Sequence, residues 1–190
     1  MNFMKNLVVL LFAFISISAF SQTKLSTTSS HIKFFSSTPA EDIEANNYKA
    51  IGVIKPDKGS IVFSIPMQSF EFEKALMQKH FNTEKFLHTK AFPKSKFKGT
   101  ITNITSIDFD KDGTYVADVT GFLTIRGVTK EISEKFNIVV KDGTVTGTTE
   151  FPIVLADYGI AFKEGKPSTN LAKTIKVTAK FNFTKISRSE

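Results

Sequence analysis

The sequence contains no cysteine and no tryptophan, and only six prolines. Without cysteine the chain can form no disulfide, carry out no thiol redox chemistry and use no cysteine nucleophile. Its stability must therefore come from the packing of side chains and from the closure of sheets.

Arginine-rich blocks are also absent, although the formal net charge is +7. Lysine and glutamate are interspersed along the chain, whereas a nucleic-acid-binding surface requires basic residues clustered in a patch or stripe. The charge favours solubility and a transient attraction to anionic membrane surfaces. We expect no nucleic-acid partner.

Catalytic motifs are missing as well: the chain has no G-x-S-x-G, no phosphate-binding loop, no G-x-G-x-x-G and no H-E-x-x-H. Asp108, Asp110, Asp112 and Gly113 match the start of a calcium loop, but Val119 stands where that loop needs its closing glutamate. A polar hairpin turn is the better interpretation of this segment.

A second set of candidate metal ligands consists of His80, Glu84 and His88, which would share one face of a continuous helix. Asn82 and Thr83 disfavour a helix across this segment. We therefore expect no metal, no cofactor and no enzymatic activity, and expect His80 to be a hydrogen-bonded structural residue beneath a short helix.

Residues 1–21 have the features of a secretory signal peptide: a positively charged start, a short apolar stretch, and the small residues Ala19 and Ser21 before cleavage ahead of Gln22. A membrane anchor is the alternative, but the apolar stretch is shorter than the roughly 20 residues that a span requires. We expect a secreted or periplasmic protein with one mature domain, residues 22–190.

What the mature chain does contain is a regular alternation of apolar and polar residues. From Tyr115 to Ile125 every second residue is apolar or glycine, the period of a strand with one buried face. Eight such runs are expected, at 31–37, 48–55, 60–67, 95–105, 114–126, 131–140, 144–151 and 173–184. One short helix is expected at 74–81.

Two Lys-Asp-Gly-Thr sequences, at 111–114 and 141–144, predict tight turns with positive φ at Asp-Gly. Strands joined by such turns are antiparallel, which predicts an all-β fold: an eight-stranded antiparallel barrel with one short helix. A barrel of this size is either filled by its own side chains or holds one small ligand. Of the 20 phenylalanines, the 16 that lie after residue 21 fit both interiors.

Several segments resemble one protein family. Residues 121–130, GFLTIRGVTK, resemble the G-x-L-T-I-R-G-V-T-K signature of the YceI-like family of secreted lipocalin-like proteins. Residues 86–93, FLHTKAFP, with 97–98, FK, resemble its F-F-D-V-x-K-Y-P-x-x-x-F-K segment. Residues 80–81, HF, stand where the family has an upstream H-L. Residues 157–160, DYGI, resemble its D-F-G-I segment.

This resemblance implies a lipocalin-like barrel with an apolar pore that binds isoprenoid chains or other long amphiphiles, and no shared catalytic apparatus. The chain departs from the family at Leu155, where an arginine is usual, and near Met77 and Gln78, where an Arg-Asp pair is usual. If those polar groups hold a head group, the ligand here differs.

Glu134 is a further departure, because it shares the strand phase of Ile132, Phe136 and Ile138, where the family favours an apolar residue. An unpaired carboxylate in a dry barrel is costly, so Glu134 should lie near a wet mouth or beside a cation. A local bulge that turns it outward is the alternative.

We predict a non-catalytic protein that sequesters or carries a long-chain lipid or isoprenoid in its barrel. The alternative is a structural or stress-protective envelope protein with a self-filled barrel, and an enzyme that acts on a lipid ranks last. The residues expected to point inward and bind the ligand are Phe34, Phe63, Ile65, Phe97, Ile101, Tyr115, Val119, Leu123, Phe136 and Ile138. The sequence leaves the ligand's identity and the oligomeric state open.

Overall fold

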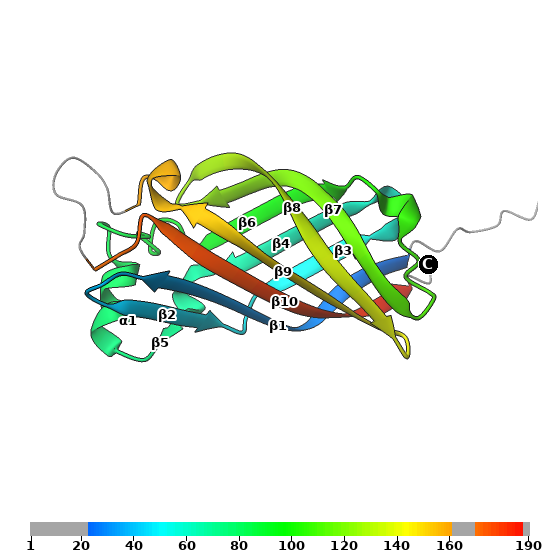
Figure 1. Ribbon diagram of the computed structural model, residues 1–190, viewed down its shortest axis with the longest axis horizontal. Helices are drawn as coiled ribbons and strands as arrows, with labels where there is room; N and C mark the ends of the chain where they lie inside the picture. Colours follow the sequence, from blue (N-terminus) through cyan, green and yellow to red (C-terminus); the bar gives the residue numbers. More distant parts are fainter. Residues whose placement is uncertain (1–22, 161–169, 188–190) are drawn as a thin grey trace, which may run out of the picture.

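The computed structural model describes residues 23–160 and 170–187, and this part of the chain forms one barrel (Figure 1). Its strands are β1 (Thr23–Ser37), β2 (Asp42–Asn47), β3 (Ile51–Lys55), β4 (Ser60–Pro66), β5 (Glu71–Phe72), β6 (Lys94–Ile101), β7 (Gly113–Ile125), β8 (Val128–Lys141), β9 (Thr144–Val154) and β10 (Thr174–Ser187). The helical segments are α1 (Ala75–Asn82) and the short 3-10 helices η1 (Pro56–Lys58), η2 (Met67–Ser69), η3 (Ile104–Ser106) and η4 (Leu155–Tyr158).

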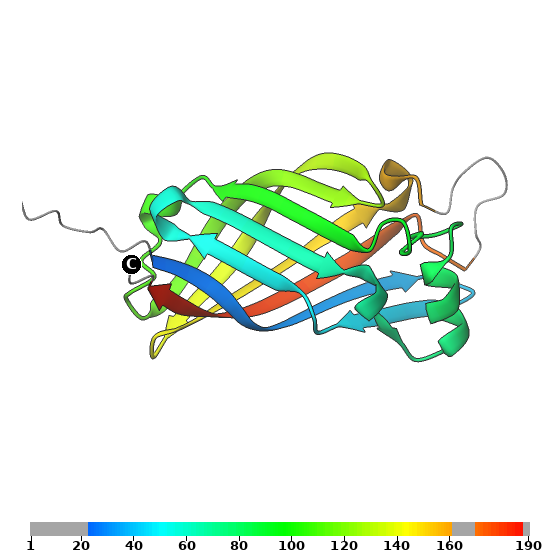
Figure 2. The same cartoon turned by 180° about the vertical axis from the view of Figure 1, so that it is seen from behind.

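Eight of the strands close the barrel, in the order β1, β3, β4, β6, β7, β8, β9, β10 and back to β1, with every pairing antiparallel. Strand β2 pairs with the second half of β1 and carries the two-residue β5 on its far side. Figure 2 shows this extension beside the barrel wall. The predicted eight-stranded antiparallel barrel with one helix is confirmed, and each predicted strand range overlaps one barrel strand.

Two of the connections are tight turns at positive φ. Asp142 and Gly143, with φ of 49° and 75°, join β8 to β9 as the sequence predicts. Arg126 and Gly127, with φ of 50° and 78°, join β7 to β8 in the same way. Two successive positive φ values give a turn whose twist matches that of the flanking strands.

The turn predicted at 111–114 is wrong. Neither Asp112 nor Gly113 is among the positive-φ residues, and Gly113 is already the first residue of β7. The connection from β6 runs through residues 102–112 and includes η3. The Asp112 carboxylate accepts a hydrogen bond from the backbone N–H of Asp142, at 3.2 Å, so this aspartate supports the neighbouring turn.

The two ends of the barrel differ. At one end, where the described chain begins at Thr23 and finishes at Ser187, the interior is packed by side chains that are at most 1% exposed. They are Leu25, Ile54, Ile101, Ala117, Ile138, Val145 and Phe183. We call this the packed end.

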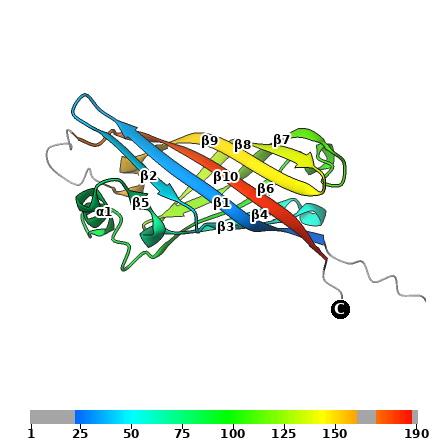
Figure 3. The ribbon, with the colours of Figure 1, turned by 90° about the horizontal axis from the view of Figure 1, so that it is seen from below.

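The other end carries α1, η2 and η4, and Figure 3 shows α1 lying beside β5 at that end, away from the two described termini. Helix α1 coincides to within one residue with the helix predicted at 74–81. In the described part of the chain no helix is long and apolar enough to cross a membrane. We call this the helical end.

Candidate ligand-binding site

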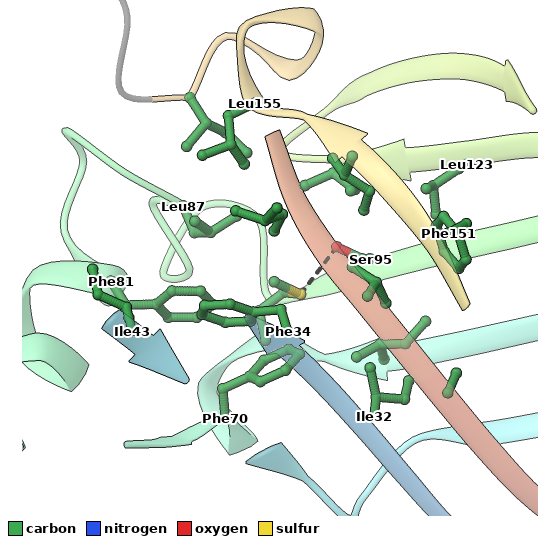
Figure 4. A pocket seen from close by; sticks show the side chains of 18 of the residues that line it. Ile32, Phe34, Ile43, Phe70, Phe81, Leu87, Ser95, Leu123, Phe151 and Leu155 are labelled. Carbon is green, nitrogen blue, oxygen red and sulfur yellow. Dashed lines mark hydrogen bonds between the residues drawn. The ribbon is translucent and has the colours of Figure 1, made fainter. Parts of the chain in front are cut away.

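A cavity of about 610 Å³ lies inside the helical end, bounded by strands of the barrel and by the helical segments above them. This volume falls in the range of about 300–1,000 Å³ that is typical of small-molecule sites. Figure 4 shows its walls, with Ile32, Leu123 and Phe151 on strands and Leu87 and Leu155 on the segments that close the end.

The floor of the cavity is a cluster of phenylalanine rings that separates it from the packed end. Phe63 is at its centre: its ring stacks on Phe181 with centroids 4.3 Å apart and meets Phe136 edge-on at 5.9 Å. The ring centroid of Phe97, on the neighbouring strand, lies 6.4 Å from that of Phe63. The barrel is therefore packed below this cluster and hollow above it.

A second phenylalanine cluster forms the rim at the helical end. Phe34 of β1 lies 5.5 Å from Phe70, 5.7 Å from Phe72 and 5.8 Å from Phe81, measured between ring centroids. Aromatic pairs at such distances stabilise one another beyond the area they bury. The rim cluster thereby attaches α1 and β5 to the barrel wall.

Of the ten residues predicted to face inward, seven line this cavity: Phe34, Phe63, Ile65, Phe97, Val119, Leu123 and Phe136. Ile101 and Ile138 face inward but are buried in the packed end, at 1% and 0% exposure. Tyr115 lies near the start of β7, where its hydroxyl donates to the Lys111 carbonyl at 3.0 Å. These three do not line the cavity, and ligand binding by any of the ten residues stays a prediction.

Other cavity residues could not be found from strand phase, because they lie outside the eight predicted strands. Among them are Phe70, Phe81, Leu87, Leu155 and Ile160. Two signals in the sequence could have found them: large apolar residues recur in segments that would otherwise be polar loops, and Phe81, Leu87 and Ile160 lie in the segments that resemble the family. They close the helical end over the cavity.

Polar groups in the cavity wall are few and mostly paired. The Ser95 hydroxyl donates to the Met67 sulfur at 3.0 Å. At the rim, Lys74 forms an ion pair with Glu41 at 3.0 Å. His80 is exposed at the rim, and within the described residues its ring makes no hydrogen bond, so its predicted place as a bonded residue beneath the helix is wrong.

Glu134 points into the cavity from β8. The pairing of β7 with β8 is regular from Gly113 opposite Val140 to Ile125 opposite Val128, so the alternative of a bulge that turns Glu134 outward is wrong. Burial raises the pKa of the Glu134 carboxyl above its usual range. The carboxylate is thus placed where its charged form is disfavoured.

Arg126 ties together three segments at the helical end. Its Nη1 donates to the Gly159 carbonyl just after η4, and its Nη2 donates to the Glu84 carbonyl after α1 at 2.7 Å. Its Nε is buried without a hydrogen-bond partner among the described residues. Arg126 therefore positions the walls of the cavity.

The two candidate metal sites are not assembled. Helix α1 ends at Asn82, so His80, Glu84 and His88 do not share one helical face. Asp110 is engaged by Lys185 in an ion pair, and the Asp108 carboxylate accepts the Asp110 backbone N–H at 2.9 Å. Among the residues that the structure describes, no three histidine or acidic side chains gather as metal ligands do.

Comparison with known sequences identifies one matching family. The model of the YceI-like domain matches residues 18–183. UPF0312 proteins of Pseudomonas putida strains W619 and GB-1 are each 36% identical to this chain over 90 residues. That match covers 46% of this chain and 43% of each relative, so it spans less than half the length of either protein.

Solved structures share the fold at low identity. A polyisoprenoid-binding domain from Saccharophagus degradans, described as implicated in plant cell wall breakdown, superimposes with a TM-score of 0.70 at 14% identity, covering 86% of this chain and 98% of that one. Burkholderia cenocepacia BcnA superimposes with a TM-score of 0.66 at 18% identity, covering 80% of this chain and 95% of that one. A Campylobacter jejuni YceI protein superimposes with a TM-score of 0.52 at 21% identity, covering 76% of this chain and 82% of that one. At such identities the likeness shows the barrel fold alone.

Proposed function

The chain belongs to the YceI-like domain family, and we propose that it sequesters or carries a long-chain isoprenoid or other lipid, with the apolar tail inside the helical end of the barrel. The proposed mechanism is non-catalytic. The polyisoprenoid-binding description of the similar domain from Saccharophagus degradans supports the class of ligand.

The observation that carries the proposal is the apolar cavity itself. Its volume of about 610 Å³ corresponds to on the order of 20 groups the size of a water molecule. Its floor and rim are both formed by phenylalanine clusters. Apolar cavities take up apolar molecules such as hydrocarbons.

The balance of energies favours a long ligand over a short one. Each CH₂ moved from water into the cavity contributes about 0.8 kcal/mol, whereas association costs on the order of 4 to 15 kcal/mol before any net affinity appears. A chain of a few carbons would hardly bind. A chain of about ten carbons or more overcomes the lower part of that cost.

The same cavity argues against a structural protein whose barrel is filled by its own side chains. Only the packed end has that character, with residues such as Ile101 and Ile138 at 1% and 0% exposure. We also propose that residues 1–21 are a signal peptide and that the protein works outside the cytoplasm, where a protein that shields a lipid tail would be useful.

Mass spectrometry of an organic extract from natively purified protein tests the proposal. We expect one or more long-chain amphiphiles in near-stoichiometric amount, and none from a matched sample that has been unfolded, washed and refolded without lipid. The refolded sample should take up added amphiphile. A native extract without lipid, together with a refolded barrel that binds no long-chain amphiphile, would contradict the proposal.

A further inference from the structure

The barrel wall is split between β8 and β9. Strand β8 pairs with β7 from Val128 to Val140, but it pairs with β9 only where residues 137–141 face residues 144–148. From Thr149 to Val154, β9 pairs with β10 alone. Figure 1 shows the two strands diverging from their shared turn. Pro152 lies in this stretch of β9, which is paired with β10 on one side and has a free edge toward β8, as expected of a proline in a strand edge.

The cavity extends into this split. Its wall includes residues from both separated edges, which we call the side window: Ile132, Glu134, Lys135, Thr149, Phe151 and Ile153. Lys135 is on the outward phase of β8, where its ammonium group pairs with Asp118 at 2.9 Å. A residue on the outer face borders an internal cavity only because the wall is open beside it.

The window is bounded at both ends. The Thr149 hydroxyl donates to the Lys135 carbonyl at 2.8 Å, so a side chain bridges the strands directly beyond the last paired residues. At the other end η4 packs near β8, and its Leu155 is 5% exposed. The split is therefore a defined opening in the barrel side.

Glu134 lies in this window with its hydrogen-bonding capacity unused. On the paired side of β8 its neighbour is Val119, which offers only an apolar side chain. Lys135, the adjacent cation, is engaged by Asp118. Within the described residues no group donates a hydrogen bond to the Glu134 carboxylate or pairs with its charge.

We propose that the side window holds the polar head of the bound amphiphile, and that Glu134 accepts hydrogen bonds from a hydroxyl or ammonium head group. This inference rests on the proposed function. An ionised carboxylate is an acceptor only, so it pairs with heads that donate and repels a phosphate or a carboxylate. The tail would then lie on the phenylalanine floor, and the head would leave the barrel through its side.

Ligands that share one tail and differ only in the head test this selectivity. At pH 7.5 we expect dodecylammonium and dodecanol to bind the native protein on the order of tenfold more tightly than dodecyl phosphate, a difference of about 1.4 kcal/mol. Glu134→Gln should abolish the discrimination against the phosphate. The matched control is Glu131→Gln, an exposed position on the same strand, which should leave the order of affinities unchanged.

The outcomes separate the two proposals. Failure of all three ligands to bind would overturn the proposed function. If all three ligands bind equally and Glu134→Gln does not change this, the head-group assignment would be overturned, while the proposed lipid-binding function would stand. Tightest binding of dodecyl phosphate, lost in Lys74→Gln, would place the head at the helical end instead.

The position of the head group can be tested with a dye, because the chain has no cysteine and a single introduced thiol is therefore labelled specifically. An environment-sensitive dye on Lys135→Cys should change its emission when dodecylammonium binds, because that site borders the side window. The same dye on Lys141→Cys, an exposed position at the far end of β8, should not respond. A response at Lys141→Cys alone would contradict the placement of the head.

Discussion

Glu134 shows how one side chain couples stability to the cavity. Burial raises its pKa, so the folded protein holds this proton more tightly than the unfolded chain does. Its contribution to stability is therefore fully present below the ordinary glutamate pKa and is lost as the pH rises through the raised value. Glutamine has nearly the same shape but does not ionise, so a glutamine at position 134 would not lose stability as the pH rises.

We expect Glu134→Gln to raise the melting temperature of the ligand-free protein at pH 7.5, and the difference from the parent to vanish below about pH 4. Melting curves recorded from pH 3.5 to 8 on both proteins measure this. Glu131→Gln on the exposed face of β8 should show no such pH-dependent gain. A gain of equal size in both variants would show that the cause is surface charge and not the burial of Glu134.

Arg126 has a different part, because its guanidinium joins carbonyls from two distant segments, at Glu84 and Gly159. Lysine keeps the charge but lacks the forked geometry that reaches both acceptors. Arg126→Lys should lower the free energy of unfolding by about 1.5 to 3 kcal/mol, the usual range for a hydrogen bond to a charged group. It should also speed amide hydrogen exchange near residues 84 and 159, and unchanged exchange there would contradict the positioning role.

At the scale of elements, the alternation of apolar and polar residues predicted the long strands well, because each long strand has one face in the core. It missed the first part of β1, where residues 23–30 are mostly serine and threonine, and β2, whose sequence is DIEANN. These strands depend on tertiary partners: the Ser30 hydroxyl donates to the Ala50 carbonyl at 2.7 Å, and buried Asn47 donates to the Pro66 carbonyl at 2.8 Å. Such long-range bonds leave no periodic trace in the sequence.

Two glycines set how closely neighbouring elements approach. A Cβ at Gly121 would lie 2.4 Å from the Gly99 Cα on β6, and backbone cannot move aside. A Cβ at Gly147 would lie 2.2 Å from the Phe136 ring, which borders the cavity and has space to turn into it. The same added methyl group should therefore act differently at the two positions.

We expect Gly121→Ala to destabilise the barrel by about 1 to 3 kcal/mol, as overpacking does. Gly147→Ala should cost less stability but weaken the binding of a long-chain alcohol, since the displaced ring occupies cavity volume. Denaturant unfolding and ligand titration on the two variants measure both effects. The reverse pattern, with binding lost only in Gly121→Ala, would show that the Phe136 ring does not yield into the cavity.

At the scale of the whole molecule, strand phase predicts which side chains face inward but not how far along the barrel each one lies. Leu123 and Ile138 share the inward phase, yet Leu123 borders the cavity and Ile138 is in the packed end. The difference arises because the phenylalanine floor, centred on Phe63, crosses the barrel between them. That level is set by pairings among strands distant in sequence, so the sequence left the choice between a filled and a hollow interior open.

The two ends make opposite predictions for the same substitution. Leu123→Trp adds bulk to space that a ligand would use, so it should block lipid uptake at a nearly unchanged melting temperature. Ile138→Trp forces the same residue into a filled region and should cost about 1 to 3 kcal/mol of stability. Uptake of a long-chain alcohol and thermal unfolding, measured on both variants, separate the ends. A marked loss of stability in Leu123→Trp, in a parent protein that binds no lipid, would mean that the barrel is packed throughout and that the container function is wrong.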